Sequence, residues 1–212
     1  MKIKGIIFDM DGVLIEAKEW HYEALNKALS LFGYEISRYD HLVTYDGLPT
    51  SDKLKMMSRE HGLPQGLHPY INMLKQEYTA EKIYRYCRPI FVHEFALSRL
   101  NAEGYKLAVA SNSIRDTVDI MMKKANLTPY LQFSLSNQDV KKAKPNPEIY
   151  NTAIAKLGFS PRACLVVEDN KNGIQAAESA GANVMRVDTV YDVTYENIVE
   201  SIKRSESAGG GA

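Results

Sequence analysis

Near the amino terminus, an apolar run leads directly into two carboxylates and a glycine. The segment reads Ile6-Ile7-Phe8-Asp9-Met10-Asp11-Gly12. Such a run is typical of a buried strand in a parallel sheet, and the carboxyl ends of these strands are where open α/β sheets bind ligands. Because alternate residues of an extended chain point the same way, Asp9 and Asp11 can face one reacting centre, one attacking while the other moves a proton. An ordinary Asp-Gly turn with a capping aspartate is the competing interpretation.

Further along the chain, apolar runs alternate with amphipathic helical patterns. Strands are predicted at 106–110, 132–136, 163–167 and 184–187, and helices at 92–103, 116–126, 147–157 and 173–180. This alternation indicates βαβ units with right-handed crossovers and a parallel sheet. The predicted fold class is therefore α/β, with a Rossmann-like doubly wound parallel sheet.

Between the first strand and the strand at 106–110, the pattern is helical throughout. Helices are predicted at 19–32, from the capping residues 50–52 to 61, and at 69–86. This is far more chain than a crossover between parallel strands needs. We therefore expect an inserted, all-helical cap domain at 18–84, an α/β core domain formed by 1–17 and 85–204, and a flexible tail at 205–212. An insertion at this edge of the sheet can close over the cleft and expel water.

The charge balance limits the classes of partner. The 212 residues include 26 Lys and Arg against 26 Asp and Glu, so neither a basic surface for nucleic acid nor an acidic tail is expected. No apolar segment has the length of a membrane span, and no signal-peptide pattern precedes the first strand. Cys87 and Cys164 lie far apart and indicate neither a disulfide nor a zinc framework. We expect a cytoplasmic protein with a small-molecule substrate.

Polar residues follow three of the predicted core strands. In chain order they are Asp9 and Asp11, Ser111 and Asn112, and Glu168 and Asp169. Because parallel strands end at one edge of a sheet, these residues are expected in one cleft. Crowded carboxylates repel unless a cation compensates them, and an all-oxygen set with few carboxylates suits Mg²⁺, which also binds substrate phosphate.

A lysine in a proline-rich stretch completes the set. Lys144 lies between Ala143 and Pro145, just before a predicted helix, where it can offset the charge of a phosphoryl group and of Asp9. Each of these segments alone also has a purely structural interpretation, as a turn, a helix cap or a solvated lysine.

Four segments, in this order, resemble the motifs of the haloacid dehalogenase superfamily of phosphotransferases. They are Asp9-Met10-Asp11-Gly12-Val13-Leu14, Ser111-Asn112-Ser113, Lys144-Pro145 and Val167-Glu168-Asp169-Asn170. Their joint order is specific, and the resemblance covers nearly the whole chain. The helical insertion after the first motif is similar to the subfamily that includes phosphoglycolate phosphatase and β-phosphoglucomutase. An acid at position 11 argues against the dehalogenases, which carry none there.

The resemblance implies a mechanism with assigned roles. Asp9 attacks phosphorus in line to form an aspartyl phosphate, while Asp11 protonates the leaving oxygen and then activates water. Ser111 and the backbone N–H of Asn112 hold phosphoryl oxygens, and Lys144 and Mg²⁺ stabilise the charge of the transition state. The implied metal ligands are the Asp9 side chain, the Asp11 backbone oxygen, Glu168 and Asp169.

The substrate is less constrained by the sequence. Candidate contacts are His21 in the first helix of the insertion, the loop at Gly47, which resembles the substrate-facing cap loop of the family, Lys75 and Arg115. Surface or packing roles for His21 and Arg115 are the open alternatives, and a solvated face is the more common role for a lysine such as Lys75. A mutase of this subfamily usually has an arginine soon after the loop glycine, whereas residues 48–51 are Leu-Pro-Thr-Ser.

We therefore predict a Mg²⁺-dependent phosphohydrolase of a small phosphorylated metabolite, such as a sugar or hydroxy-acid phosphate. Two alternatives stay open. One is a β-phosphoglucomutase-like sugar phosphomutase, which passes the phosphoryl group to a second sugar hydroxyl instead of to water. The other is a catalytically idle protein that keeps the fold for binding.

Overall fold

The structure is a computed structural model and describes residues 2–208. The chain divides into two compact units. Unit 1 consists of Met1–Glu16 and Arg88–Ala212, and unit 2 is the inserted segment Ala17–Cys87. The role of unit 2 as a cap domain stays a prediction.

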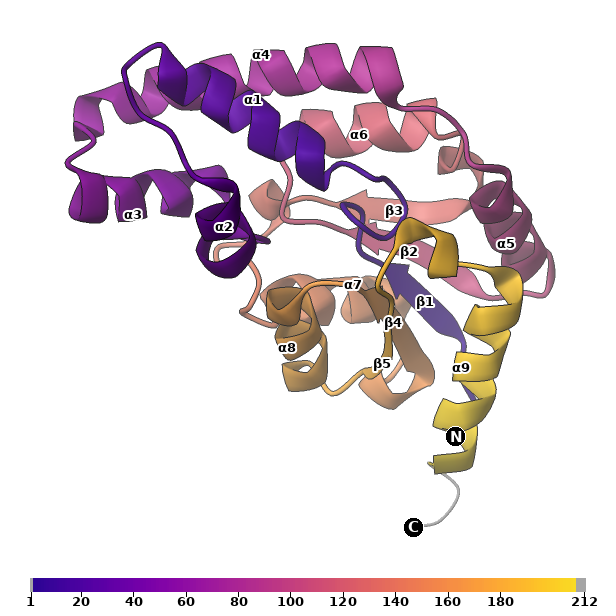
Figure 1. The fold of residues 1–212 in the computed structure, drawn as a ribbon. Coiled ribbons are helices and arrows are strands. Elements are labelled where there is room, and N and C mark those ends of the chain that lie inside the picture. The colour runs from indigo at the N-terminus through magenta and orange to yellow at the C-terminus, as the bar shows by residue number, and fades with distance from the viewer. Residues whose placement is uncertain (1, 209–212) are drawn as a thin grey trace. The chain divides into compact units, whose positions relative to one another are not determined.

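Unit 1 contains a five-stranded parallel sheet in the order β3-β2-β1-β4-β5 (Figure 1). The strands are β1 Gly5–Phe8, β2 Lys106–Ala110, β3 Leu131–Leu135, β4 Cys164–Glu168 and β5 Asn183–Arg186. The central strand β1 pairs with β2 on one side and with β4 on the other. The strand order therefore reverses at the carboxyl end of β1, which is the switch point where doubly wound sheets bind ligands. The predicted α/β fold class is confirmed.

Helices cover both faces of this sheet, which explains why β1 and the first four residues of β4 are apolar and why both strands are fully buried. The helices of unit 1 are α5 Phe91–Ala102, α6 Arg115–Lys124, α7 Glu148–Leu157, α8 Lys171–Ser179 and α9 Tyr195–Ala208. On one face, α7 and α8 contribute Ile149, Tyr150 and Ala176 to the buried cluster that also contains Ile7 and Val166 of the sheet. Within residues 2–208, no helix combines the length and apolarity that crossing a membrane requires.

The expectation of a flexible tail was wrong over residues 205–208, because the helix α9 continues to Ala208. Ile198 and Ile202 lie one turn apart and are buried, so this helix has an apolar stripe that docks it on unit 1. Its last turn is also anchored, because Glu206 Oε1 accepts a hydrogen bond of 2.8 Å from the Ile3 N–H just before β1. The rest of the predicted tail, residues 209–212, lies outside the described residues.

A buried histidine connects α5 to the loop that follows β1. His93 is 1% exposed, its Nε2 lies 2.7 Å from the carbonyl oxygen of Val190, and it also hydrogen-bonds the backbone of Leu14. Burial lowers the pKa of His93 below its ordinary value, although these backbone contacts oppose the effect. The folded protein therefore favours neutral His93.

This lowered pKa makes unfolding dependent on pH. The unfolded chain binds a proton at His93 more readily than the folded chain does. The free energy of unfolding should therefore fall as the pH drops from about 6.5 through the lower folded pKa. We expect a lower Tm at about pH 5.5 than at about pH 7.5, and a smaller difference in His93→Gln. The exposed His61 gives a matched control, His61→Gln. Equal pH dependence of Tm in wild type and His93→Gln would contradict this explanation.

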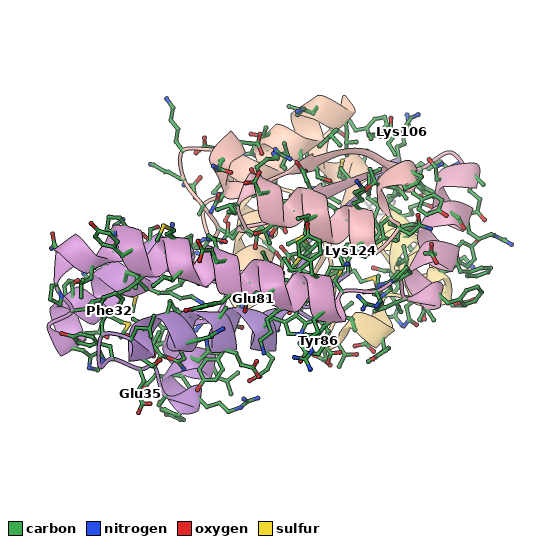
Figure 2. The ribbon with its side chains drawn as sticks, turned by 90° about the horizontal axis from the view of Figure 1, so that it is seen from above. Phe32, Glu35, Glu81, Tyr86, Lys106 and Lys124 are labelled. Atoms are coloured by element: carbon green, nitrogen blue, oxygen red, sulfur yellow. The ribbon has the colours of Figure 1, made fainter. Side chains whose placement is uncertain are left out.

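Unit 2 is built from helices alone. They are α1 Lys18–Ser30, α2 Arg38–Asp40, the π-helical turn η1 His41–Tyr45, α3 Thr50–His61, the short 3-10 helix η2 Gln65–Leu67 and α4 His68–Tyr86. The long helices α1 and α4 lie side by side (Figures 1 and 2). Leu29, Leu54 and Ile71 belong to a buried apolar cluster that joins α1, α3 and α4. This separate core makes unit 2 a compact body of its own.

Candidate active site

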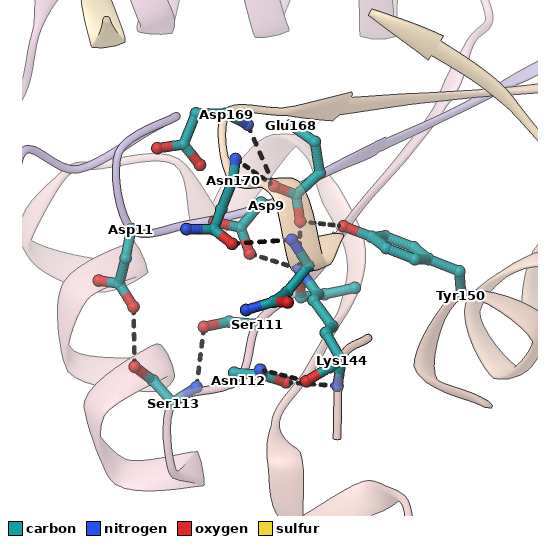
Figure 3. A network of polar contacts seen from close by, with 12 residues as sticks. Asp9, Asp11, Ser111, Asn112, Ser113, Lys144, Tyr150, Glu168, Asp169 and Asn170 are labelled. Carbon is teal, nitrogen blue, oxygen red and sulfur yellow. Dashed lines mark hydrogen bonds and ion pairs between the residues drawn. The ribbon is translucent and has the colours of Figure 1, made fainter. Parts of the chain in front are cut away.

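Four segments of unit 1 meet at the carboxyl edge of the sheet (Figure 3). Asp9 follows β1, Ser111 follows β2, Glu168 ends β4, and Lys144 comes from the loop before α7. Asp9, Glu168 and Asp169 each place a carboxylate oxygen within 4.8 Å of the others. The strand order explains this convergence, because β2, β1 and β4 are neighbours in the sheet.

The Lys144 ammonium group lies at the centre of this site. It donates hydrogen bonds to Asp9 Oδ1 at 2.5 Å, to Glu168 Oε1 at 2.7 Å and to the Ala110 carbonyl oxygen at 2.8 Å. Its side chain is only 4% exposed. Burial alone would lower the pKa of Lys144, but the carboxylates of Asp9 and Glu168 raise it to about 12. Lys144 is therefore a permanent buried cation at neutral pH.

Asn112 fixes the loop that carries this lysine. The Lys144 N–H donates to Asn112 Oδ1 at 3.1 Å, and Asn112 Nδ2 donates to the Lys144 carbonyl oxygen at 3.4 Å. Asn137 Nδ2 in turn donates to the Asn112 carbonyl oxygen at 2.9 Å. The loop after β2 and the loop before α7 are thus joined by side-chain to backbone hydrogen bonds.

Negative charge is concentrated around Asp9. Burial raises the pKa of Asp9 well above its ordinary value, Lys144 opposes this shift, and the carboxylates of Glu168, Asp169 and Asp11 add to it. One lysine thus faces several acids in a largely buried site. The arrangement favours the binding of a further cation.

Asp11 lies outside the group formed by Asp9, Glu168 and Asp169. Its Oδ2 accepts a hydrogen bond of 2.8 Å from the Ser113 hydroxyl, and the Ser113 N–H donates to Ser111 Oγ at 3.0 Å (Figure 3). Ser113 therefore connects the second aspartate to the serine after β2. In the sequence, the signal for this contact is only a hydroxyl at the end of Ser111-Asn112-Ser113, a position for which the motif predicts no role of its own.

Comparison with known proteins identifies the family. The sequence profile described as haloacid dehalogenase-like hydrolase matches residues 6–187. The chain belongs to this family. It is 28% identical over 204 residues to protein CbbY of Rhodobacter capsulatus, covering 90% of the chain and 88% of the relative. It is 25% identical over 193 residues to the phosphorylated carbohydrates phosphatase of Thermotoga maritima, covering 91% and 86%.

Solved structures show the same fold. A β-phosphoglucomutase from Clostridium difficile superimposes with a TM-score of 0.84 at 20% identity, covering 97% of this chain and 99% of the other. CbbY from Rhodobacter sphaeroides, in complex with phosphate, gives a TM-score of 0.78 at 22% identity, covering 87% and 85%. These structures show the fold, and the family match together with the relatives named as phosphatases makes the protein a haloacid dehalogenase-like hydrolase.

Three of the candidate substrate contacts lie in unit 2. His21 is on α1, where its Nδ1 lies 3.3 Å from Lys75 Nζ of α4. The solvated position expected as the common role of Lys75 is wrong, because this residue is 7% exposed and belongs to the buried stripe of α4. Gly47 lies in the turn after η1 with a positive φ of 72°, a conformation that glycine adopts readily. The substrate contacts of His21, Lys75 and Gly47 stay predictions.

Arg115 is engaged in contacts at the start of α6. Its guanidinium donates to the Ser134 carbonyl oxygen at 2.8 Å and pairs with Asp139. Its backbone N–H donates to Gln138 Oε1 at 2.8 Å. These contacts anchor α6 to β3 and to the loop that follows, so they support the packing alternative and leave the substrate role of Arg115 a prediction.

Proposed function

We propose that this protein is a Mg²⁺-dependent phosphohydrolase that cleaves a small phosphate monoester through an aspartyl phosphate on Asp9. One observation carries the proposal: a buried ammonium group, Lys144, lies 2.5 Å from Asp9 Oδ1 at the switch point of the sheet. A nucleophilic carboxylate needs a fixed positive charge beside it when it attacks a phosphoryl group that is itself negative.

The residues present fit a magnesium ion. Asp9, Glu168 and Asp169 offer only oxygen atoms, which hard cations such as Mg²⁺ prefer, and their mutual repulsion is only partly balanced by Lys144. We assign the Asp9 and Asp169 side chains and the Asp11 backbone oxygen to hold the ion. When bound, Mg²⁺ would orient the ester and offset the charge that spreads over its phosphoryl oxygens.

The first half of the proposed reaction transfers the phosphoryl group to the enzyme. A carboxylate oxygen of Asp9 attacks phosphorus, and the bond to the ester oxygen breaks. Protonated Asp11 gives its proton to the departing oxygen, so the product leaves as an alcohol. The Ser111 hydroxyl and the Asn112 N–H donate hydrogen bonds to the phosphoryl oxygens, while Lys144 remains protonated throughout.

The second half releases phosphate. Asp11, now a carboxylate, accepts a proton from a water molecule, and that water oxygen attacks phosphorus. The bond between phosphorus and Asp9 breaks, which restores both aspartates to their starting protonation. The hydrogen bond from Ser113 holds Asp11 on the side of the loop after β2, apart from the carboxylates assigned to the ion.

The substrate class is a phosphorylated carbohydrate or a related small ester, in line with the name of the Thermotoga maritima relative. A sugar phosphomutase is the second candidate, favoured by the likeness to the Clostridium difficile β-phosphoglucomutase. The absence of arginine at 48–51 favours the phosphatase. A protein that only binds a ligand has no need of a buried ammonium group beside Asp9, so the Asp9–Lys144 pair favours an enzyme.

Phosphate release from a panel of sugar and hydroxy-acid phosphates tests the proposal. We expect Mg²⁺-dependent release from at least one ester, loss of turnover in EDTA and recovery when Mg²⁺ is restored. Phosphorus NMR of the same mixtures distinguishes the mutase, because isomers of a sugar phosphate would interconvert faster than free phosphate forms. If no ester on the panel is hydrolysed or isomerised in the presence of Mg²⁺, the proposal is wrong.

A further inference from the structure

The carboxylate of Glu168 is occupied by hydrogen-bond donors on both oxygens (Figure 3). Oε1 accepts from Lys144 Nζ and from the Tyr150 hydroxyl, each at 2.7 Å. Oε2 accepts from the backbone N–H groups of Asp169 and Asn170, each at 3.1 Å. A carboxylate has about four acceptor positions, so these four donors account for all of them. Little of Glu168 is left to bind a metal ion.

The space around Glu168 allows few other orientations. The residue is completely buried. On α8, a Cβ atom at Gly173 would lie only 1.7 Å from Glu168 Oε1, which means that the carboxylate fills the place a side chain would take there. Glycine at 173 is therefore a requirement of this orientation of Glu168.

Tyr150 is the side chain that approaches Glu168 from outside the four family motifs. It lies on α7, is completely buried, and places its ring 4.7 Å from Lys144 Nζ while its hydroxyl reaches Glu168. A hydrogen bond to an ionised acceptor is stronger than one between neutral groups. Tyr150 thus contacts both members of the ion pair that positions the ammonium group beside Asp9.

We propose that Tyr150 is a positioning residue, whose hydroxyl fixes Glu168 so that this carboxylate orients Lys144 toward Asp9 instead of binding the metal. The inference rests on the proposed function, in which Asp9 is the nucleophile. It removes Glu168 from the expected metal ligands. The side chains of Asp9 and Asp169 and the backbone oxygen of Asp11 remain in that set.

Tyr150→Phe tests this role, because it deletes one hydroxyl and keeps the ring. We expect kcat for the hydrolysed ester to fall roughly tenfold, with KM changed less than about twofold. The reason is that a poorly oriented Lys144 stabilises the transition state less, while it leaves the binding of the ester unchanged. Because neither Tyr150 nor Glu168 belongs to the proposed ligand set, the Kd for Mg²⁺, measured by calorimetry, should stay close to that of wild type, whereas losing the support of a metal ligand would weaken binding about 10- to 100-fold. Tyr195→Phe is the matched control. The Tyr195 hydroxyl also donates a hydrogen bond to a glutamate, Glu103, at 2.5 Å, but this pair lies away from the active site.

A second variant displaces Glu168 and keeps the tyrosine. Gly173→Ala forces the carboxylate away from α8, and it should lower kcat at least as much as Tyr150→Phe while leaving the Kd for Mg²⁺ close to that of wild type. This variant decides the question if Tyr150→Phe does not fold. Thermal unfolding of each variant ensures that kinetics are measured on folded protein.

Two results would overturn the inference. The first is a folded Tyr150→Phe protein with wild-type kcat, and the second is a loss of Mg²⁺ affinity that parallels the loss of kcat, which would make Glu168 a metal ligand. Failure of the proposed function looks different, because the wild-type enzyme itself would then release no phosphate.

Discussion

Asp9→Asn is expected to abolish turnover, lowering kcat by about 10⁴-fold or more. The amide keeps the shape of the side chain but lacks the carboxylate that attacks phosphorus. The fold should survive, because burial and three neighbouring acids already raise the pKa of Asp9 and make a neutral side chain acceptable there. Steady-state kinetics with the best ester of the panel, together with Tm, check both statements.

The exposed Asp116 in the first turn of α6 supplies the matched control. Asp116→Asn makes the same chemical change away from the sheet edge and should retain wild-type kcat. Substantial turnover by folded Asp9→Asn would remove Asp9 as the nucleophile.

Lys144→Met is expected to damage both catalysis and folding. It leaves Asp9 and Glu168 buried without their cation, and breaking a buried ion pair by removing one partner typically costs about 3 to 5 kcal/mol. We also expect a loss of about 10³-fold in kcat, because the ammonium group can no longer offset the charge of the transition state. Urea unfolding measures the loss of stability, and kinetics at low temperature measure the loss of kcat.

Lys142 offers the comparison for this substitution, because it lies in the same loop and is exposed. Lys142→Met should leave stability and kcat close to those of wild type. Wild-type stability in Lys144→Met would mean that the three hydrogen bonds of the ammonium group do not form in solution.

The main fold was predictable because its signals are local. Strands such as β2 and helices such as α7 have apolar periods and flanking turn residues of their own, and the observed bounds lie within two residues of those predicted. The helix α9 was missed over its whole length. Its stripe has only Ile198 and Ile202 buried, and its end is composed of small polar residues that resemble a tail. The hydrogen bond between Ile3 and Glu206 joins chain ends that no local pattern can connect.

The sequence was enough to predict which residues come together at the site. It was not enough to predict which hydrogen bonds they make there. The order of strand ends indicated that Asp9, Ser111 and Glu168 would converge, since parallel strands end at one edge. The partners of Glu168 and the hydrogen bond from Ser113 to Asp11 depend on how loops and α7 pack, and short sequence patterns do not encode these distances. Arg115 shows the same limit, because its distance from Ser111 along the chain gave no sign of its contacts with β3 and Asp139.

The central claim is that Asp9 itself carries the phosphoryl group during turnover. Rapid acid quenching of enzyme, Mg²⁺ and a substrate labelled in its phosphoryl group, followed by peptide mapping, tests it directly. We predict label on the peptide that contains Asp9, formed and lost at rates consistent with kcat, and none in Asp9→Asn. Turnover that proceeds with no label on this peptide, or with the label on another residue, would contradict the account.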